Sequence, residues 1–445
     1  MIIKTLIFSI ACLIHVTVMA VNDELELPPT IAPEEFDQPL IQPTGDLSLR
    51  DAIVLTLKHS PELATYAWTI RSREIDQIEA GLLPNPEAEF EIENFAGSGD
   101  IGGFKSAETT IALSQLIELG DKRMKRQQLA STDRDLARWD YEVKRVDLLS
   151  QTAIAYAEVL GDQERLSIAK EIKDLAEEIY QTVNKRVEAG KVSQLEEIKS
   201  RVELSKSKLS LINAERQLAI SKQNLVKSWG GTDVTFNRVI GDFYSISSIP
   251  NLNSIVTKLN NNPDLARWAT EVSRHQNAIT LARADTIPDI SVSAGVRHFN
   301  GSDDVAAVAS ISIPLFWFDN KQTGVQRSEV ELSQASKQRE VTETKLHSAL
   351  LIAYQRLNIL NHEVTTLSND ILPSAEEAFD AATKIYRLGK LDLLSLLDAQ
   401  RTYFDTRQQH IDSIKEFHRI VIAIERLIGS SLSEENDYIA EEAIR

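Results

Sequence analysis

The sequence predicts an α+β protein built from an internal tandem repeat, in which strands rather than helices cross a membrane. Three observations indicate this fold class. The segment 176–230 recurs without gaps at 375–429, at an offset of 199 residues. Two regions alternate polar and apolar residues as strands do. The regions between them carry helical patterns much longer than an ordinary globular helix.

The repeat defines the expected domain organisation. Gly190-Lys191 falls on Gly389-Lys390, and Pro61 falls on Pro263 at a similar offset of 202. A period of about 200 residues is too long for a solenoid unit, so each half is a large piece of one architecture. We expect repeat 1 at 47–230, a linker at 231–253 and repeat 2 at 254–429.

The two ends of the chain differ from the repeats in composition. Residues 1–20 predict a secretory signal peptide, with Lys4 before an apolar stretch. Residues 21–46, rich in proline and acids, predict an extended arm that lies along the body or stays loose, and 430–445 form an acidic tail. Cys12, the only cysteine, lies in the signal peptide, so the mature chain has no disulfide and no thiolate ligand. Cleavage before Cys12, as in a lipoprotein, is the less favoured alternative.

Composition excludes two classes of protein. The formal charge of −18 argues against a nucleic-acid partner, because binding phosphates requires a basic surface. After the signal peptide, no apolar run approaches the roughly 20 residues of a membrane-spanning helix, so a membrane crossing must use strands.

Two predicted β-hairpins have the length for such a crossing. The first spans 87–119, where Glu87, Glu89, Glu91 and Glu93 alternate with Ala88, Phe90 and Ile92. The second spans 289–318 and ends in Phe316-Trp317-Phe318, which we expect in an interfacial aromatic belt. Four strands cannot close a barrel, and hydrocarbon does not tolerate an open sheet edge. Several chains must therefore share one barrel, and three chains would supply twelve strands.

The helical regions predict a cylinder of coiled coils. A first helix begins after Ser48, a candidate N-cap, and runs to about Leu82 with a kink or break at Pro61. The next, from about 121 to 189, would be on the order of 100 Å long. In the second half we expect helices at 322–370 and 375–388, with a break at Pro373. The last helix repeats apolar or aromatic residues every seven positions, which predicts supercoiling against its neighbours.

A turn with its own chemistry joins the helices of each repeat. Gly190 and Gly389 suit the left-handed position that ends a helix. Ser193 and Asp392 suit the cap of the following helix, and Glu196 would complete a capping box with Ser193.

This order of elements resembles the TolC family of outer-membrane efflux factors. The residues that carry the resemblance are Tyr386-x-x-Gly389 followed by Leu397-Asp398-Ala399-Gln400-Arg401. Four further stretches resemble the cobalt-zinc-cadmium resistance branch of that family: 80–86, 91–99, 114–123 and 186–193.

The resemblance implies a homotrimer in the outer membrane of a Gram-negative cell, with a large periplasmic portion. Its twelve-stranded barrel would continue into a long α-helical tunnel. It also implies docking to a periplasmic membrane-fusion adaptor and an inner-membrane pump of the resistance-nodulation-division (RND) class. The docking tips would comprise Gly190, Lys191, Gly389, Lys390 and Leu391. The periplasmic gate would comprise Asp398 with Ser395, which stands where the family has a second aspartate, and Asp392.

The four glutamates at 87–93 are candidate lumen acids. They would all face the lumen if the alternating apolar residues face lipid, and a ring of carboxylates attracts divalent cations. The plainer alternative is that any porin-type strand has a polar inner face.

No constellation predicts catalysis, a cofactor or a resident metal. The mature histidines show no His-x-x-x-His spacing, and His410 lies on a helical seam where a packing role is favoured. Met124 is the only methionine after the signal peptide, so there is no thioether relay for soft metals.

The sequence thus predicts a passive outer-membrane duct for a tripartite pump that exports divalent metals of the cobalt, zinc and cadmium class. The alternatives are a duct for drugs or other organic solutes, and a periplasmic coiled-coil structural protein. The sequence does not name the metal ion, the adaptor or the pump.

Overall fold

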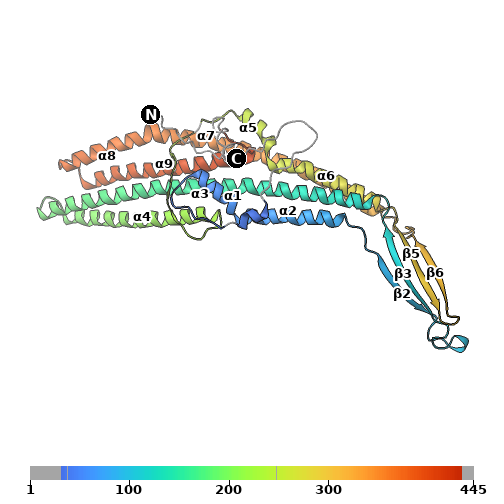
Figure 1. Ribbon diagram of the computed structural model, residues 1–445. Helices are drawn as coiled ribbons and strands as arrows, with labels where there is room; N and C mark the ends of the chain where they lie inside the picture. Colours follow the sequence, from blue (N-terminus) through green and yellow to red (C-terminus); the bar gives the residue numbers. More distant parts are fainter. Residues whose placement is uncertain (1–31, 38, 247, 433–445) are drawn as a thin grey trace. The chain divides into compact units, whose positions relative to one another are not determined.

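A computed structural model describes residues 32–37, 39–246 and 248–432 of the chain (Figure 1). The predicted signal peptide and nearly all of the acidic tail lie outside these residues. The helices are α1 (Leu49–His59), α2 (Pro61–Ala80), α3 (Lys122–Glu188), α4 (Gln194–Lys227), α5 (Leu252–Lys258), α6 (Pro263–Ala284), α7 (Gln322–Thr366), α8 (Leu372–Arg387) and α9 (Leu393–Ile428). The strands are β1 (Gly45–Leu47), β2 (Glu87–Glu93), β3 (Glu108–Ile117), β4 (Phe236–Val239), β5 (Ile290–Phe299) and β6 (Asp304–Ser312).

The chain divides into two compact units, and each draws on both halves of the sequence. The sheet unit comprises 68–140 and 266–342. The helical unit comprises the described parts of 1–67, 141–265 and 343–445. Among the described residues, no helix is both long and apolar enough to cross a membrane.

The sheet unit contains the two predicted hairpins in one antiparallel sheet, in the order β2-β3-β5-β6. Both hairpin predictions are confirmed. The strand β3 joins the hairpins, because it pairs with β5 from Glu108↔Phe299 to Ile117↔Ile290. The last strand is shorter than predicted and ends at Ser312, since Pro314 has no amide hydrogen for a sheet ladder. Phe316-Trp317-Phe318 therefore follow the strand rather than end it.

An ion pair fixes the junction between helices and strands in this unit. Lys122, at the start of α3, places its Nζ 2.7 Å from Asp289 Oδ1 and 2.6 Å from the carbonyl oxygen of Ile287. The Leu119 amide donates to the same Asp289 oxygen at 2.9 Å. Because Lys122 is buried and the carboxylate is held by two donors, this pair connects the exit of β3 to the entry of β5.

The predicted helix starts are largely correct. Ser48 caps α1 in a reciprocal capping box with Asp51, and the first helix breaks into α1 and α2 just before Pro61. The long helix is confirmed at 67 residues in α3. The expected break at Pro373 is wrong in form: the helix continues through a π-helical turn at Leu367–Ile371, and this turn accommodates the proline that follows it and lacks an amide hydrogen.

The helical unit has an apolar core around Tyr156 and Trp229. Both side chains are fully buried, and the Tyr156 hydroxyl lies 2.8 Å and 2.6 Å from the carbonyl oxygens of Leu47 and Ile240. These contacts hold the short parallel pair β1–β4 against α3. The described end of the N-terminal arm thus packs on the helices of its own unit.

Candidate functional site

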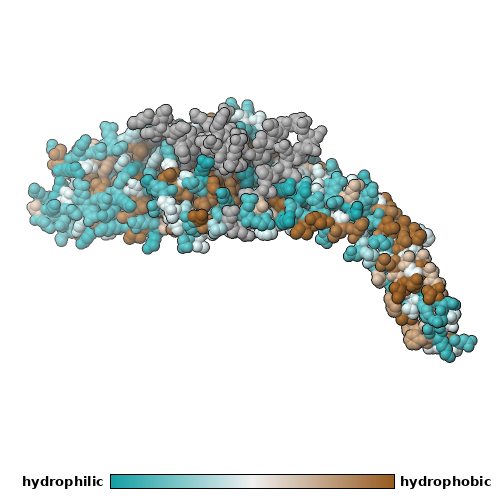
Figure 2. All heavy atoms as spheres, in the orientation of Figure 1, coloured by the Kyte–Doolittle hydropathy of each residue, from teal (hydrophilic) through white to brown (hydrophobic). Residues whose placement is uncertain are grey.

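The four-stranded sheet has one polar face and one apolar face. The register places the four β2 glutamates on the same face as the even-numbered residues of β3 and β6 and the odd-numbered residues of β5. We call this the polar face; it includes Glu108, Thr110, Ser114, Ser293, Arg297, Asp304 and Ser310. The opposite, apolar face includes Phe90, Ile111, Leu113, Val296 and Ile311, which are 53–71% exposed in the single chain. Figure 2 shows hydrophobic residues gathered over this sheet.

The candidate lumen acids therefore share one face, as their alternation predicts. Glu87, Glu89 and Glu91 are exposed, and Glu93 is half-buried. Glu87 and Glu89 pair in register with Ser114 and Ala112, and no ion pair involves either carboxylate within the described chain. Their role as channel lining stays a prediction.

Arg297 is a residue that the sequence alone did not reveal. It lies on β5 and bonds three polar-face residues: its Nη2 is 2.8 Å from Glu93, its Nη1 donates to Glu108 at 2.9 Å, and its Nε donates to Thr110 at 2.8 Å. Two of these partners are almost 190 positions away in sequence, so only the β3–β5 register brings them together.

The candidate docking tips have the predicted backbone. Gly190 and Gly389 adopt φ of +66° and +72°, the left-handed conformation that ends a helix. Their amides donate to Val187 and Tyr386 carbonyls at 2.9 Å in both cases. The flanking lysines are exposed and Leu391 is half-buried, so both turns are accessible in the single chain.

The two caps beside these turns differ. The Asp392 carboxylate accepts hydrogen bonds from the Ser395 amide at 3.0 Å and its hydroxyl at 2.7 Å, and these bonds hold the Asp392 pKa below its usual value. The predicted box between Ser193 and Glu196 is wrong. The Glu196 amide instead donates to the Ser193 carbonyl at 3.0 Å, so the hydroxyl is not needed as a cap.

The two helical hairpins pack together just behind the turns. Ile179 and Val183 of α3 form one buried cluster with Tyr386 of α8 and Leu396 of α9. The Arg186 guanidinium lies 4.7 Å from the Tyr386 ring centre and donates to the Tyr386 carbonyl at 3.1 Å. The first hairpin thus holds the second through a cation–π contact as well as apolar packing.

The candidate gate acid Asp398 is exposed on α9, six residues after Asp392. Within the described chain its carboxylate makes no ion pair or hydrogen bond, and only its backbone carbonyl accepts, from Thr402 at 3.0 Å. The structure thus leaves this carboxylate available and brings no second acid of the predicted gate against it, because Asp392 is engaged with Ser395.

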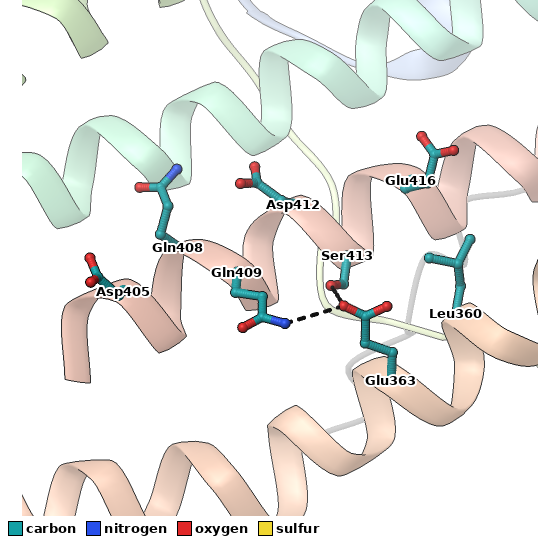
Figure 3. A pocket seen from close by; sticks show the side chains of 8 residues that line it. All are labelled: Leu360, Glu363, Asp405, Gln408, Gln409, Asp412, Ser413 and Glu416. Carbon is teal, nitrogen blue, oxygen red and sulfur yellow. Dashed lines mark hydrogen bonds between the residues drawn. The ribbon is translucent and has the colours of Figure 1, made fainter. Parts of the chain in front are cut away.

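An open groove between α7 and α9 follows further along the same helix (Figure 3). Its lining is mostly acid or amide: Leu360 and Glu363 from α7, and Asp405, Gln408, Gln409, Asp412, Ser413 and Glu416 from α9. Ser413 and Gln409 donate to Glu363 at 2.8 and 3.4 Å, and Glu416 pairs with Arg356 at 3.0 Å. These acids are thus mostly paired, and no group of acids, histidines or cysteines suited to a metal occurs in the described chain.

His410 and His418 of α9 pack against the linker between the halves. His418 donates from Nε2 to the Phe243 carbonyl at 2.9 Å, and the His410 ring centre lies 5.8 Å from that of Tyr244. Burial lowers the pKa of both imidazoles below 6.5. The geometry agrees with a packing role for His410.

Known proteins match most of the chain. The model of the family "Outer membrane efflux protein" matches residues 52–231 and 255–430. The cobalt-zinc-cadmium resistance protein CzcC of Cupriavidus metallidurans is 30% identical over 86% of this chain and 90% of its own. The nickel-cobalt-cadmium resistance protein NccC of Alcaligenes xylosoxydans is 22% identical over 64% and 66%. The pyoverdine export protein OpmQ of Pseudomonas putida is 22% identical over 81% of each chain.

Solved structures agree on the fold. The CmeC outer membrane channel of Campylobacter jejuni superposes with a TM-score of 0.73 at 16% identity, over 95% of this chain and 94% of its own. The chain therefore belongs to the outer membrane efflux protein family and lies in the outer membrane of a Gram-negative cell, with a large periplasmic helical portion.

Proposed function

We propose that the chain is the outer-membrane channel of a tripartite RND-type system that exports divalent heavy-metal cations. Three chains would close a twelve-stranded barrel, to which each repeat contributes one β-hairpin. The helices of the three chains would form a periplasmic tunnel. The channel itself would be a passive duct without catalytic chemistry, because the inner-membrane pump supplies the energy.

The two-faced sheet carries this proposal. Its exposed apolar face suits lipid, and its polar face suits a water-filled lumen. Its outermost strands β2 and β6 each have an unpaired edge within the described chain. Since hydrocarbon does not tolerate such an edge, the sheet needs partners, and further copies of the same sheet supply them.

The helical turns support the rest of the assembly. We propose Gly190-Lys191 and Gly389-Lys390-Leu391 as the adaptor-docking tips, because both turns are accessible. We propose Asp398 as the gate acid, with Ser395 and Asp392 as a hydrogen-bonded pair beside it.

The metal substrate rests on relatives rather than on a binding site. CzcC and NccC are named for metal resistance, whereas OpmQ is named for pyoverdine export. The acidic polar face favours cations over an organic solute. A duct for organic solutes is the second candidate. A periplasmic coiled-coil fibre does not fit membership in the family.

Growth of a deletion strain separates these candidates. We expect lower inhibitory concentrations for zinc, cadmium and cobalt, restored by the gene on a plasmid, with unchanged sensitivity to organic toxicants. Sensitisation to organic toxicants alone would contradict the metal assignment. Wild-type protein that runs as a heat-modifiable trimer in outer-membrane fractions would support the assembly, and a soluble monomer would contradict it.

A further inference from the structure

Arg297 holds the end of the polar face that lies away from the helices. Glu93 and Glu108 flank the loop 94–107, and the guanidinium binds both of them. The Glu91 carboxylate lies 3.8 Å from the same Nη2. The Asn94 amide completes the group by donating to Glu108 at 3.1 Å. One guanidinium therefore lies among three carboxylates from β2 and β3 and offsets part of their negative charge.

Without that cation, these carboxylates would resemble a divalent-cation site. Three closely spaced carboxylates are the oxygen ligands that Ca²⁺ and Mg²⁺ prefer, and their summed charge attracts other divalent ions as well. The Arg297 side chain is only 26% exposed, and all its nitrogen atoms point at polar-face residues. The guanidinium thus occupies the space between these carboxylates.

The charge of the polar face is uneven along the strands. The four described strands place six carboxylates on this face (Glu87, Glu89, Glu91, Glu93, Glu108 and Asp304) and one guanidinium, which gives −6 and +1, or −5 per chain. At the end that joins the helices, Glu87 and Glu89 face only uncharged residues across the sheet. At the other end, Arg297 is paired with Glu93 and Glu108 and lies near Glu91, and Asp304 lies opposite Phe299.

We propose that Arg297 determines cation release, by keeping divalent ions from lodging at the outer end of the channel lining. The inference rests on the proposed function, which puts the polar face in the lumen and the loop end at the exit. Conduction requires sites that attract an ion but do not retain it. Glu87 and Glu89 attract divalent cations near the tunnel, and Arg297 prevents the retention of these cations near the exit.

Channel recording in planar lipid bilayers tests this directly. Cadmium is added on the side of the barrel loops, and the concentration that halves the monovalent cation current is measured. In R297Q the face changes from −5 to −6 per chain, so we expect block at a concentration lower by about threefold or more, from Coulomb attraction at water-like screening. K105Q, which removes an exposed cation from the neighbouring loop, should leave the block unchanged.

A second variant separates charge from structure. R297Q/E108Q restores the net charge of the face, and we expect block close to that of the wild type. Block in R297Q equal to that of the wild type, or tightened block that E108Q does not reverse, would overturn the inference. Wild-type protein that forms no cation channel would instead refute the proposed function.

If R297Q does not assemble, R297H keeps the test available. Magnesium replaces cadmium as the blocker here, because neutral imidazole binds cadmium and would create a new site for it. Histidine loses its charge as pH rises through its pKa, which the neighbouring carboxylates raise, so magnesium block of the assembled R297H channel should tighten between about pH 6 and 8 more than block of the wild-type channel. Equal pH dependence in the two channels would contradict the inference.

Discussion

At the scale of single residues, the available carboxylate of Asp398 is the best candidate for the gate. Its neighbour Asp392 is held by Ser395, whereas Asp398 is exposed and bonds no described residue through its side chain. In the first repeat the equivalent position is Lys199, so only the second helical hairpin supplies an acid there.

Neutralising Asp398 should therefore change how cations enter the tunnel. We expect D398N channels to show a lower cation conductance and a roughly threefold weaker cadmium block from the side of the helical turns, because one carboxylate per chain that attracts cations is lost. Planar-bilayer recording measures both quantities. Asp380, an exposed acid on α8, is the matched control, and D380N should behave as the wild type. A D398N channel with unaltered conductance and block would remove Asp398 from the gate.

Caps and turns could be predicted from the sequence where they depend on residues that are close together in the chain. The left-handed glycines, the Ser48 N-cap and the Asp392 cap each depend on residues within four positions, and each occurs in the structure. The Ser193 cap failed because a backbone carbonyl can satisfy the same amide. Arg297 could not be predicted, because its partners Glu93 and Glu108 are reached only through strand pairing.

At the scale of elements, the four-stranded sheet is the part of the chain that is suited to insertion in a membrane. Leu113 and Ser114 are consecutive on β3 and point to opposite faces, so they form a matched pair of positions. Leu113 is 59% exposed in the single chain, as a lipid-facing residue would be.

A lysine at each position should therefore have opposite consequences. L113K puts a charge on the lipid-facing side at a cost of about 2–4 kcal/mol per chain near the bilayer midplane, so assembled trimer should be lost. S114K puts the same charge on the polar face beside Glu87 and should assemble. The amount of heat-modifiable trimer in outer-membrane fractions measures the difference. Equal assembly of both variants would contradict the assignment of the faces.

We expect the docking of the linker 231–253 on α9 to depend on pH. His410 and His418 hold its Phe243-Tyr244 segment on α9, and the negative charge of Asp242 favours a protonated His418. Burial lowers the pKa of both imidazoles in the folded chain below 6.5, so the undocked state binds more protons. The contribution of the neutral rings to docking is present above about pH 6.5 and declines as pH falls below it.

Hydrogen exchange should report this dependence. Protection of the amides at 240–246 should decrease between about pH 7.5 and 5.5, after correction for intrinsic exchange, and H418Q should flatten the decrease because it removes the more buried titrating ring. H362Q, at an exposed histidine of the same unit, should keep the wild-type pH dependence. A wild-type profile that stays level across this range would refute the docking argument.

At the scale of the whole molecule, a β-hairpin followed by long antiparallel helices occurs twice in the order of the elements. The strands and the 67-residue helix could be predicted from the periodicity of apolar residues, and the turns from their glycines. Each of these signals lies within a short stretch of sequence. The order β2-β3-β5-β6 could not be predicted, since pairing between hairpins leaves no local signal. The docking of the arm strand β1 on the linker strand β4 was unpredictable for the same reason.

Metal export from cells preloaded with radioactive cadmium or zinc measures the proposed transport itself. Deletion of the gene should slow the loss of the metal from the cells, and the gene on a plasmid should restore the wild-type rate of loss. The test uses cells whose metal export requires the inner-membrane pump. If the deletion strain of such cells exports the metal at the wild-type rate, the chain is not the export channel.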